Sequence, residues 1–299
     1  MSLDWSEQHL PVTYHAADRS SLQAQGRFLL ATKIRLVSLI GAALFGLFVW
    51  RTGQSPVDWG GVAAATSFGI ALLVEIFLLT SKPERTWYEG RAAAESVKTL
   101  SWRYMMGAEP FNRTHDRTQV DNLFLQRLDE VLEVLRDLDL TADTSVGEQI
   151  TAEMREIRSS SLAERKRLYE VARVGEQQSW YSKKAQWNRN RATKWTIAML
   201  LIESLGVAAA ILKAVGTVRG DLLGFAGAVV AAMTAWLQTK QHGALAAAYA
   251  VTALELASVR TRIAHQQDES QWAAFVSDAE EAFSREHTLW KASRGVRAI

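Results

Sequence analysis

The sequence predicts an all-α integral membrane protein: two tandem transmembrane helical hairpins, four spans in all, with long helices that extend into a cytoplasmic helical domain. Three observations support this prediction. Two pairs of charge-poor apolar runs are each joined by a short polar turn. Both pairs have the same order of flanking residues, and the segments between them are charged, poor in proline and spaced like helices. We find no segment with the alternating pattern of a strand.

The first pair of runs covers residues 36–50 and 60–80, and its only charge is Glu75. A helix on the surface of a soluble protein would show a polar stripe every three to four residues. A bilayer core of about 30 Å needs about 20 apolar residues, so the second run is long enough and the first is short. Ile34 and an Arg35 side chain that reaches back to the interface lengthen the first run. A buried hairpin in a soluble bundle is the alternative interpretation.

The second pair repeats the organisation of the first. Ala192-Thr193-Lys194 matches Ala31-Thr32-Lys33 and opens the run 195–212, which contains Glu203; the run 222–237 follows after a polar turn. Each pair also ends on a basic residue. A shared tripeptide followed by the same order of run, turn and run indicates an internal repeat of one two-helix unit.

Basic residues are concentrated outside the two turns, which hold only Arg51, Lys213 and Arg219. By the positive-inside rule, both termini and the central region are cytoplasmic, and both turns face the opposite side of the membrane. The basic residues that flank the runs are Arg19, Arg27, Lys33, Arg35, Lys82, Arg85, Arg91, Arg189, Arg191, Lys194 and Lys240.

The composition excludes several classes of protein. The 299 residues include no cysteine, which excludes disulfides, thiol catalysis and cysteine zinc sites. A net charge of +2 gives no reason to expect a nucleic acid as partner. The chain lacks a dinucleotide fingerprint and a phosphate loop, and its 6 histidines are scattered. We therefore expect no enzyme activity, no catalytic residues, no metal site and no cofactor.

Near the N-terminus we expect residues 1–19 to be irregular, because Pro11 disfavours an early helix, and a helix to start near Ser20 or Ser21. Pro83 either begins a new helix after the second span or kinks a continuous one. The helix that follows is predicted to end at 107–110. It is marked by residues at helical spacing: Trp87, Arg91, Glu95, Lys98 and Trp102.

An amphipathic helix with a coiled-coil-like spacing is predicted from Val120 to Leu138. It packs on a helix of the same chain or serves self-association. The polar segment 141–147 is the best boundary, and from Ile150 to Asn190 we expect one long helix that leads into the third span. The last two predicted helices cover 245–263 and Asp268 or Ser270 to Trp290.

These boundaries divide the chain into three parts. Residues 1–112 form a first two-span unit with its cytoplasmic helix, and residues 113–146 form an amphipathic connector and boundary. Residues 147–299 form a second two-span unit with long cytoplasmic helices.

The polar residues inside the spans are the candidate functional residues. A carboxylate in a bilayer is costly, so it usually faces water, a partner or a pore. Glu75 and Glu203 are such carboxylates, and Thr66, Ser67 and Ser204 add hydroxyl groups. Two interpretations stay open. The carboxylates only tie helices together, or one of them lines an ion path as a ring in a symmetric oligomer, which would favour cations.

Small residues recur every four positions in the second and fourth spans, and such ladders allow helices to approach closely in lipid. We expect them to be packing sites, with Glu75 on the packed side of its helix. The ladder residues are Gly61, Ala65 and Gly69 in the second span, and Gly220, Gly224, Ala228 and Ala232 in the fourth.

The order of residues around the two hairpins is similar to that of a known family. The first group is Trp87, Arg91, Glu95, Lys98, Trp102-Arg103-Tyr104 and Pro110-Phe111. The second is Arg165, Tyr169, Arg173, Gln177, Trp180-Tyr181, Lys184-Ala185 and Asn188, with Phe275, Glu280, Glu286-His287 and Trp290 near the C-terminus. In this order they resemble two tandem copies of the SLATT superfamily, two-transmembrane domains associated with bacterial nucleotide-signalling and conflict systems.

The resemblance implies a pore-forming or membrane-perturbing effector of the bacterial plasma (inner) membrane, inactive until a partner protein or a nucleotide messenger signals. Combined with the carboxylates in the spans, it predicts a channel or pore that conducts cations and acts in bacterial defence. Four spans are too few for a wide pore, so the expected partners are the lipid bilayer, permeant cations and further copies of the chain. The alternative is a non-conducting membrane scaffold that recruits partners through its cytoplasmic helices.

Overall fold

We describe the fold from a computed structural model of the chain. The structure describes residues 5–53, 56–136, 147–218 and 220–293, and the side chains of 134–136 and 284–293 are outside the description. All regular elements in these ranges are helices, and no strand occurs among them.

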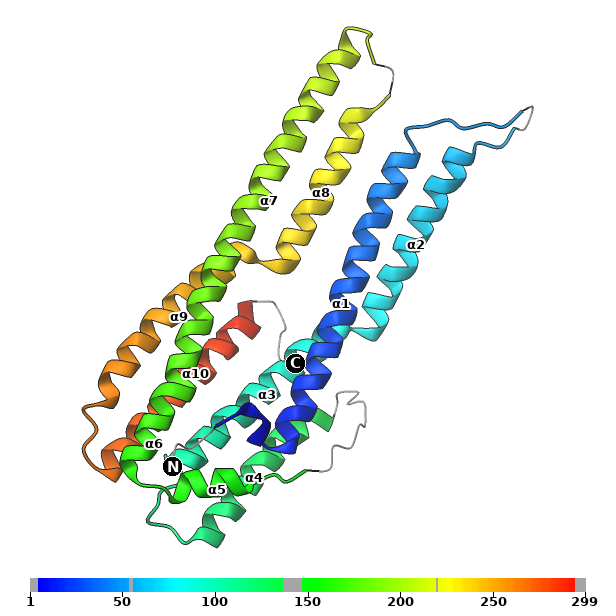
Figure 1. Cartoon of the computed structure of the whole chain (residues 1–299). Coiled ribbons are helices and arrows are strands. Elements are labelled where there is room, and N and C mark those ends of the chain that lie inside the picture. Colours follow the sequence, from blue (N-terminus) through cyan, green and yellow to red (C-terminus); the bar gives the residue numbers. More distant parts are fainter. Residues whose placement is uncertain (1–4, 54–55, 137–146, 219, 294–299) are drawn as a thin grey trace. The chain divides into compact units, whose positions relative to one another are not determined.

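Two hairpins carry the apolar runs: α1 (Val12–Phe45) with α2 (Trp59–Ser81), and α7 (Glu176–Ala214) with α8 (Leu222–Lys240) (Figure 1). Within the described residues, four helical segments, which include these helices, are long and apolar enough to cross a membrane. Their large apolar side chains are exposed, as Val37 (66 %), Leu73 (67 %) and Leu205 (69 %) show. A soluble bundle would bury such side chains. The predicted all-α membrane fold with four spans is therefore confirmed.

Both hairpins end in the same joint. The last residue before the next helix is in the left-handed conformation, with φ of 40° at Lys82 and 50° at Gln241. The amide of each joint residue donates to a carbonyl four residues earlier, at 3.2 Å after α2 and 2.7 Å after α8. A new helix follows at once: α3 (Pro83–Met106) or α9 (His242–Ile263). Of the two alternatives for Pro83, the start of a new helix is the one observed.

The turn of the first hairpin is closed by Asp58, the N-cap of α2. Its carboxylate accepts hydrogen bonds from the amides of Trp50 (2.7 Å) and Gly60 (3.0 Å). The hydrogen bond from Trp50 is the main reason that the pKa of the Asp58 carboxyl is lowered from its ordinary value. Because α1 ends at Phe45, the last residues of the predicted run, 46–50, belong to the turn and not to the helix.

The chain divides into two compact units, each with residues from both halves of the sequence. The hairpin unit comprises the described residues of Gly26–Lys82 and Tyr181–Val251. The polar unit comprises those of Met1–Gln25, Pro83–Trp180 and Thr252–Ile299. The three-part division in sequence order stays a prediction.

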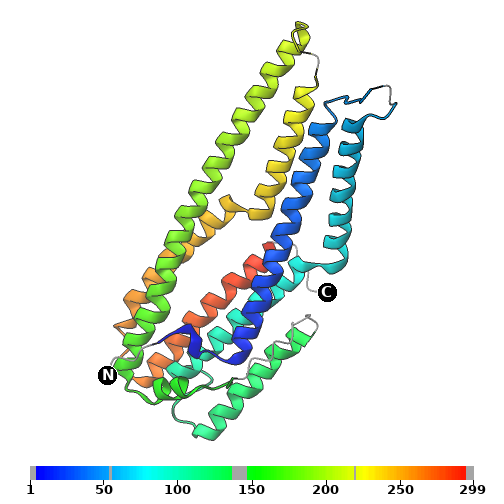
Figure 2. The same cartoon turned by 45° about the vertical axis from the view of Figure 1, so that its right-hand side comes forward.

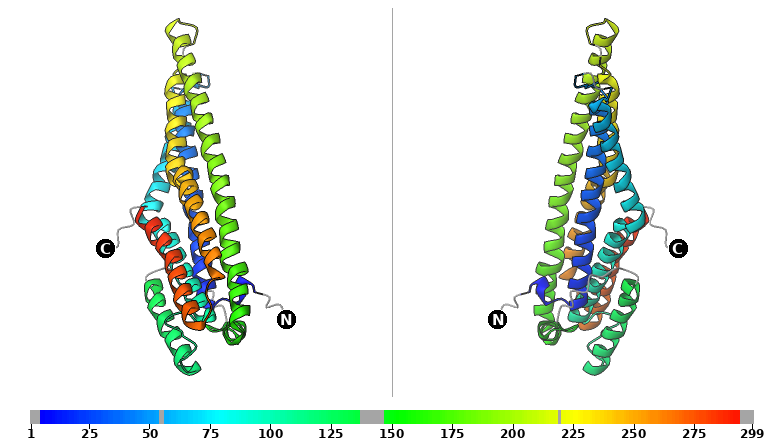
Figure 3. Two further views of the ribbon diagram at one scale, coloured as in Figure 1. Left: turned by 90° about the vertical axis from the view of Figure 1, so that its left-hand side faces the viewer. Right: turned by 90° about the vertical axis from the view of Figure 1, so that its right-hand side faces the viewer.

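The polar unit is built around α3. Figure 3 shows α10 (Glu269–Ser293) beside it, and α4 (Arg117–Arg136), α5 (Ala152–Ser159) and α6 (Leu162–Leu168) also pack on it. The side chains of α3 that meet these helices are almost completely buried. They are Val97, Trp102, Tyr104, Met105 and Met106.

The expectation of an irregular segment up to residue 19 is wrong. After the 3-10 turn η1 (Glu7–His9), α1 begins at Val12, directly after Pro11. Proline is compatible with a helix start, because the amides of the first turn have no partner within the helix. Ser21 does not begin the helix but lies inside it, where its hydroxyl donates to the carbonyl of Trp87 (3.1 Å).

The single helix expected from Ile150 to Asn190 is also wrong, because α5 ends before Ser160. Ser161 then caps α6 with Glu164: the hydroxyl accepts from the Glu164 amide, and the Glu164 carboxylate accepts from the Ser161 amide (3.0 Å). This capping box is a helix-start signal that can be read from the sequence. After α6 the helix continues without interruption through the π-helix η2 (Tyr169–Gly175) into α7 (Figure 2).

The other predicted helices form with small changes at their ends. The amphipathic helix is α4, although Leu138 and most of the segment 141–147 lie outside the described residues. α9 begins three residues before the predicted Leu245. Asp268 caps α10 by accepting from the Gln271 amide at 2.8 Å.

A pair of neighbouring glycines tests the first hairpin. A Cβ at Gly60 would overlap the carbonyl oxygen of Phe48, whereas a Cβ at Gly61 would meet only the Asp58 side chain, at 3.4 Å. We expect Gly60→Ala to lower the free energy of unfolding by about 1–3 kcal/mol. Gly61→Ala should be neutral or stabilise by up to about 1 kcal/mol, because alanine favours a helix. Thermal unfolding in detergent measures both, and equal effects would contradict this packing.

Candidate functional site

The carboxylate of Glu75 is paired inside the first hairpin. Arg35 of α1 donates a hydrogen bond to it and forms an ion pair with it, and the two side chains are 29 % and 39 % exposed. An ion pair between facing helices removes most of the cost of two separate charges in lipid. Glu75 therefore ties α1 to α2 in this structure.

Glu203 differs from Glu75. Its side chain is exposed on α7, and it forms no hydrogen bond or ion pair with any described residue. Thr196 lies two helical turns before it and Ser204 directly after it, and both are exposed. Each hydroxyl donates to the carbonyl four residues earlier, Ala192 (3.0 Å) and Leu200 (2.8 Å) respectively. Their oxygen lone pairs are left to face outward with the carboxylate.

The two candidate hydroxyl residues of α2, Thr66 and Ser67, occupy different surroundings. Thr66 is exposed, and its hydroxyl donates to the Val62 carbonyl (2.8 Å). Ser67 faces α1, where a Cβ built on Gly41 would lie 3.5 Å from the Ser67 hydroxyl oxygen. Ser67 is thus part of the contact between α1 and α2.

The small-residue ladders are not where the helices of one chain approach most closely. A Cβ at Gly69 or Gly220 would meet no described atom within 4 Å, and at Gly61 or Gly224 it would meet only the aspartate that precedes its own helix. Ala65 is also exposed. The close approach in the second hairpin is at Gly206 instead, where a Cβ would lie 3.0 Å from the Cβ of Ala226. The role of the ladders as packing sites stays a prediction.

A buried ion pair forms the centre of the polar unit. The guanidinium of Arg173 donates to both carboxylate oxygens of Glu280, at 2.9 and 2.6 Å, and the Tyr169 hydroxyl donates to the same carboxylate at 2.9 Å. All three residues are at most 2 % exposed. The π-helix η2 carries Tyr169 and Arg173, and both reach this single carboxylate of α10.

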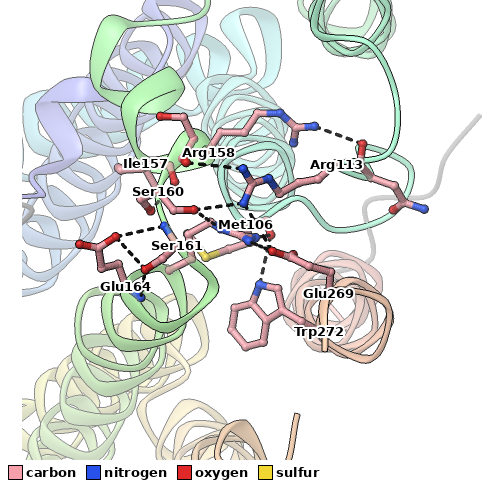
Figure 4. A network of polar contacts seen from close by, with 12 residues as sticks. Met106, Arg113, Ile157, Arg158, Ser160, Ser161, Glu164, Glu269 and Trp272 are labelled. Atoms are coloured by element: carbon pink, nitrogen blue, oxygen red, sulfur yellow. Dashed lines mark hydrogen bonds and ion pairs between the residues drawn. The ribbon is translucent and has the colours of Figure 1, made fainter. Parts of the chain in front are cut away.

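Three further arginines bind backbone carbonyls at the ends of α3 and α5 (Figure 4). Arg158 donates to the carbonyls of Tyr104 and Phe111, both at 2.8 Å. Arg165 is fully buried and donates to the Met106 carbonyl (2.5 Å), which the Trp272 indole also reaches (3.1 Å). Arg113 donates to the Ser160 carbonyl at 3.1 Å. Helix C-termini carry unpaired carbonyls and negative partial charge, so cations there are stabilising.

The polar unit joins both halves of the repeat in one core. Trp102 of α3 lies edge-on to Tyr169 (5.8 Å between ring centroids), and Tyr169 lies edge-on to Trp272 of α10 (5.6 Å). Arg103 donates to the Ser277 carbonyl at 2.9 Å. Residues of the family resemblance thus meet in space: Trp102, Arg103, Tyr104, Arg165, Tyr169, Arg173 and Glu280.

The ion pairs and hydrogen bonds of the polar unit stabilise the fold. The candidate functional residues lie in the spans. The buried arginines have carbonyl or carboxylate partners, as they must to compensate for lost hydration. Among the described residues, no group of three or more histidine, aspartate or glutamate side chains is placed to hold a metal ion.

The fold defines a class: an all-helical membrane protein built from two tandem helical hairpins. Two family models match the chain. They are SMODS and SLOG-associating 2TM effector domain 3, over residues 11–166, and SMODS and SLOG-associating 2TM effector domain 1, over residues 169–290. The chain belongs to the SLATT superfamily, in two copies as the resemblance implied. A search of curated proteins and a search of solved structures each found no match.

Sequence reasoning did not find the partner of Glu75 or the buried pair of the polar unit. From the sequence we expect the Arg35 side chain only to reach the membrane interface. Its charge, opposite to that of Glu75 on the facing helix, is the signal that predicts their pairing. Arg173 and Glu280 are far apart in the sequence, and no local pattern connects them.

Removing one partner of the buried ion pair should be severe. We expect Arg173→Met to cost about 3–5 kcal/mol in the free energy of unfolding, because Glu280 would be left as a buried charge. The double substitution Arg173→Met, Glu280→Leu should recover much of the loss. Chemical unfolding in detergent measures both.

The matched control is Arg260→Met, which removes the exposed ion pair with Glu170 (3.1 Å). Surface ion pairs contribute about 0–1 kcal/mol, so this variant should unfold nearly like the wild type. A loss at Arg173 no larger than the loss at Arg260 would show that the buried pair is not central to the polar unit.

Proposed function

We propose that this membrane effector is the subunit of a homo-oligomeric cation channel in the bacterial plasma membrane, acting in a defence system. Glu203 of α7 lines the conducting path. Both termini and the polar unit are cytoplasmic, in agreement with the basic flanks of the spans. The proposal assigns no catalytic role to the chain.

The single observation that carries the proposal is the exposed, unpaired carboxylate of Glu203 inside an apolar helix. A charged side chain at the centre of a membrane helix costs about 2.5–3.5 kcal/mol even on the lower scales. Within the chain no described residue offsets this cost. Water in a pore shared by several copies does offset it, because the carboxylate then keeps its hydration.

The neighbours of Glu203 suit such a path. The hydroxyls of Thr196 and Ser204 direct their hydrogens to their own helix, so their oxygens are acceptors toward the path. Carboxylate rings and oxygen acceptors favour cations over anions. A symmetric oligomer repeats this set of groups around its axis.

Glu75 connects two helices and does not line the ion path. Its ion pair with Arg35 makes it a tie between helices, so we do not place it in the path, nor Ser67, which faces α1. Thr66 is exposed but has no carboxylate beside it on its face. Gly61 and Ala65 of the α2 ladder are exposed in one chain, and this ladder supplies a surface on which neighbouring copies approach closely.

Charge substitutions at Glu203 test the conducting path. In planar bilayers with a KCl gradient, we expect Glu203→Gln to lower the cation-over-anion permeability ratio of the purified protein, and Glu203→Lys to lower it further or reverse it. The reversal potential measures this ratio.

Glu75→Gln is the matched control, since it removes the same charge from another span. It should leave the reversal potential unchanged but lower thermal stability, because Arg35 loses its partner. An unchanged reversal potential in both Glu203 variants would remove Glu203 from the path. A wild-type protein that carries no current would favour the non-conducting scaffold.

Gly69→Leu tests the assembly surface. A Cβ at Gly69 meets no described atom, so the fold of one chain should tolerate leucine there. Close packing between chains should not, and we expect the oligomer to dissociate at a higher protein concentration than the wild type. Gly26→Leu is the control, because that glycine also has open space around it but lies outside the apolar run. Light scattering in detergent measures the assembly, and equal behaviour of the two variants would exclude the α2 ladder as an interface.

A further inference from the structure

An open cavity of about 480 Å³ lies in the hairpin unit, between the two hairpins and beside the basic ends of the spans. Its walls come from α1, α7, α8 and the first residue of α9. The lining residues are Lys33, Leu36, Val37, Ile40, Trp187, Arg191, Trp195, Ala232, Met233, Trp236, Lys240 and His242.

The charge of the cavity has one sign. Lys33, Arg191 and Lys240 line it, and none of its lining residues is acidic. Lys33 and Lys240 approach the ring of Trp236 from two helices, with their ammonium nitrogens 5.5 and 5.3 Å from its centroid. Arg191 lies over Trp187 at 5.3 Å. Contact with aromatic rings holds these basic side chains at the cavity.

The cavity also has a polar and an apolar end. Lys33 precedes the apolar part of α1 and Lys240 ends α8, so the cations lie at the boundary of the apolar segments. Leu36 and Ile40 continue from Lys33 along α1 at helical spacing and line the same cavity. Met233 lines it two turns before Lys240 on α8. Charge at the boundary and apolar walls beyond it match an amphiphile with an anionic head.

One wall is held rigidly at the charged end. The His242 ring nitrogen Nδ1 lies 2.7 Å from the side-chain oxygen of Asn188, and both residues are at most 5 % exposed. The Asn188 amide donates to the Lys184 carbonyl (2.9 Å), and the His242 ring lies edge-on to Trp187. This network joins α7 to α9 and fixes the ring that Arg191 covers.

We propose that this cavity is a binding site for an anionic phospholipid. The headgroup phosphate lies between Lys33, Arg191 and Lys240, and an acyl chain follows Leu36, Ile40 and Met233. Basic clusters at the ends of membrane helices attract anionic lipids. A soluble anion would gain nothing from the apolar walls, and a neutral lipid would offer no counter-charge to Lys33 and Arg191, which have no acidic residue beside them in the lining. Because both hairpins contribute, the bound lipid connects them.

Native mass spectrometry of the purified full-length protein in a neutral detergent tests this site. Phosphatidylglycerol and phosphatidylcholine with identical acyl chains are added separately. We expect phosphatidylglycerol to be retained at a lower lipid concentration, by roughly tenfold or more, and to raise the unfolding temperature. Inorganic phosphate and glycerol phosphate, which lack acyl chains, should do neither.

The triple substitution Lys33→Gln, Arg191→Gln, Lys240→Gln should abolish this preference. The control triple Arg27→Gln, Arg189→Gln, Lys194→Gln removes the same net charge from basic residues that flank the spans but do not line the cavity. It should keep the preference, which separates a specific site from general attraction to an anionic surface.

Three results would overturn the proposal: equal retention of the two lipids by the wild type, an unchanged preference in the cavity triple, or the same loss in both triples. Stabilisation by inorganic phosphate equal to that by phosphatidylglycerol would also overturn it and indicate a soluble anion. None of these results depends on ion conduction. The proposed channel function can therefore be disproved without disproving the lipid site.

Discussion

The cost of an unpaired charge away from water governs both units of this protein. In the polar unit, Arg173 meets the carboxylate of Glu280 with two hydrogen bonds and is fully covered. In the hairpin unit, Arg35 and Glu75 form an ion pair between facing helices, so neither charge is unpaired. Glu203 is the exception, since no described residue compensates it. Because the carboxylates of Glu280 and Glu75 are both paired, the unpaired carboxylate of Glu203 stands out. Its charge requires water or a further copy of the chain as a partner.

The two SLATT domains of the chain are not independent bodies. Each hairpin ends in the same left-handed joint, at Lys82 and Gln241, and passes directly into the next helix. The helices beyond the joints then share one polar core, in which Trp102 of the first copy contacts Tyr169 of the second. The arrangement resembles a dimer made within a single chain, because two sets of repeat residues bury one another. α1 and α7 contribute residues to both units without a break in the helix.

Much of the fold follows from local rules. The apolar run 60–80 and the position of Pro83 together predict α2 and its end to within a few residues. The predicted helix boundaries are wrong where two local signals conflict. Helical spacing across 150–190 hid the capping box of Ser161, and Pro11 was treated as a helix breaker where it precedes a helix start. For the candidate site, the sequence singles out the two carboxylates inside the spans but does not separate their roles.

The sequence by itself determined that the chain is helical, that it contains two copies of one unit, and that its apolar segments belong in lipid. These properties depend on composition and on spacing along one helix. Only the tertiary structure decided which charges are paired. Glu75 and Glu203 look alike in the sequence, yet one faces Arg35 and the other faces outward. The same holds for Lys33, Arg191 and Lys240, which three helices bring to one cavity. Such pairings depend on distances across space, and spacing along the chain does not contain them.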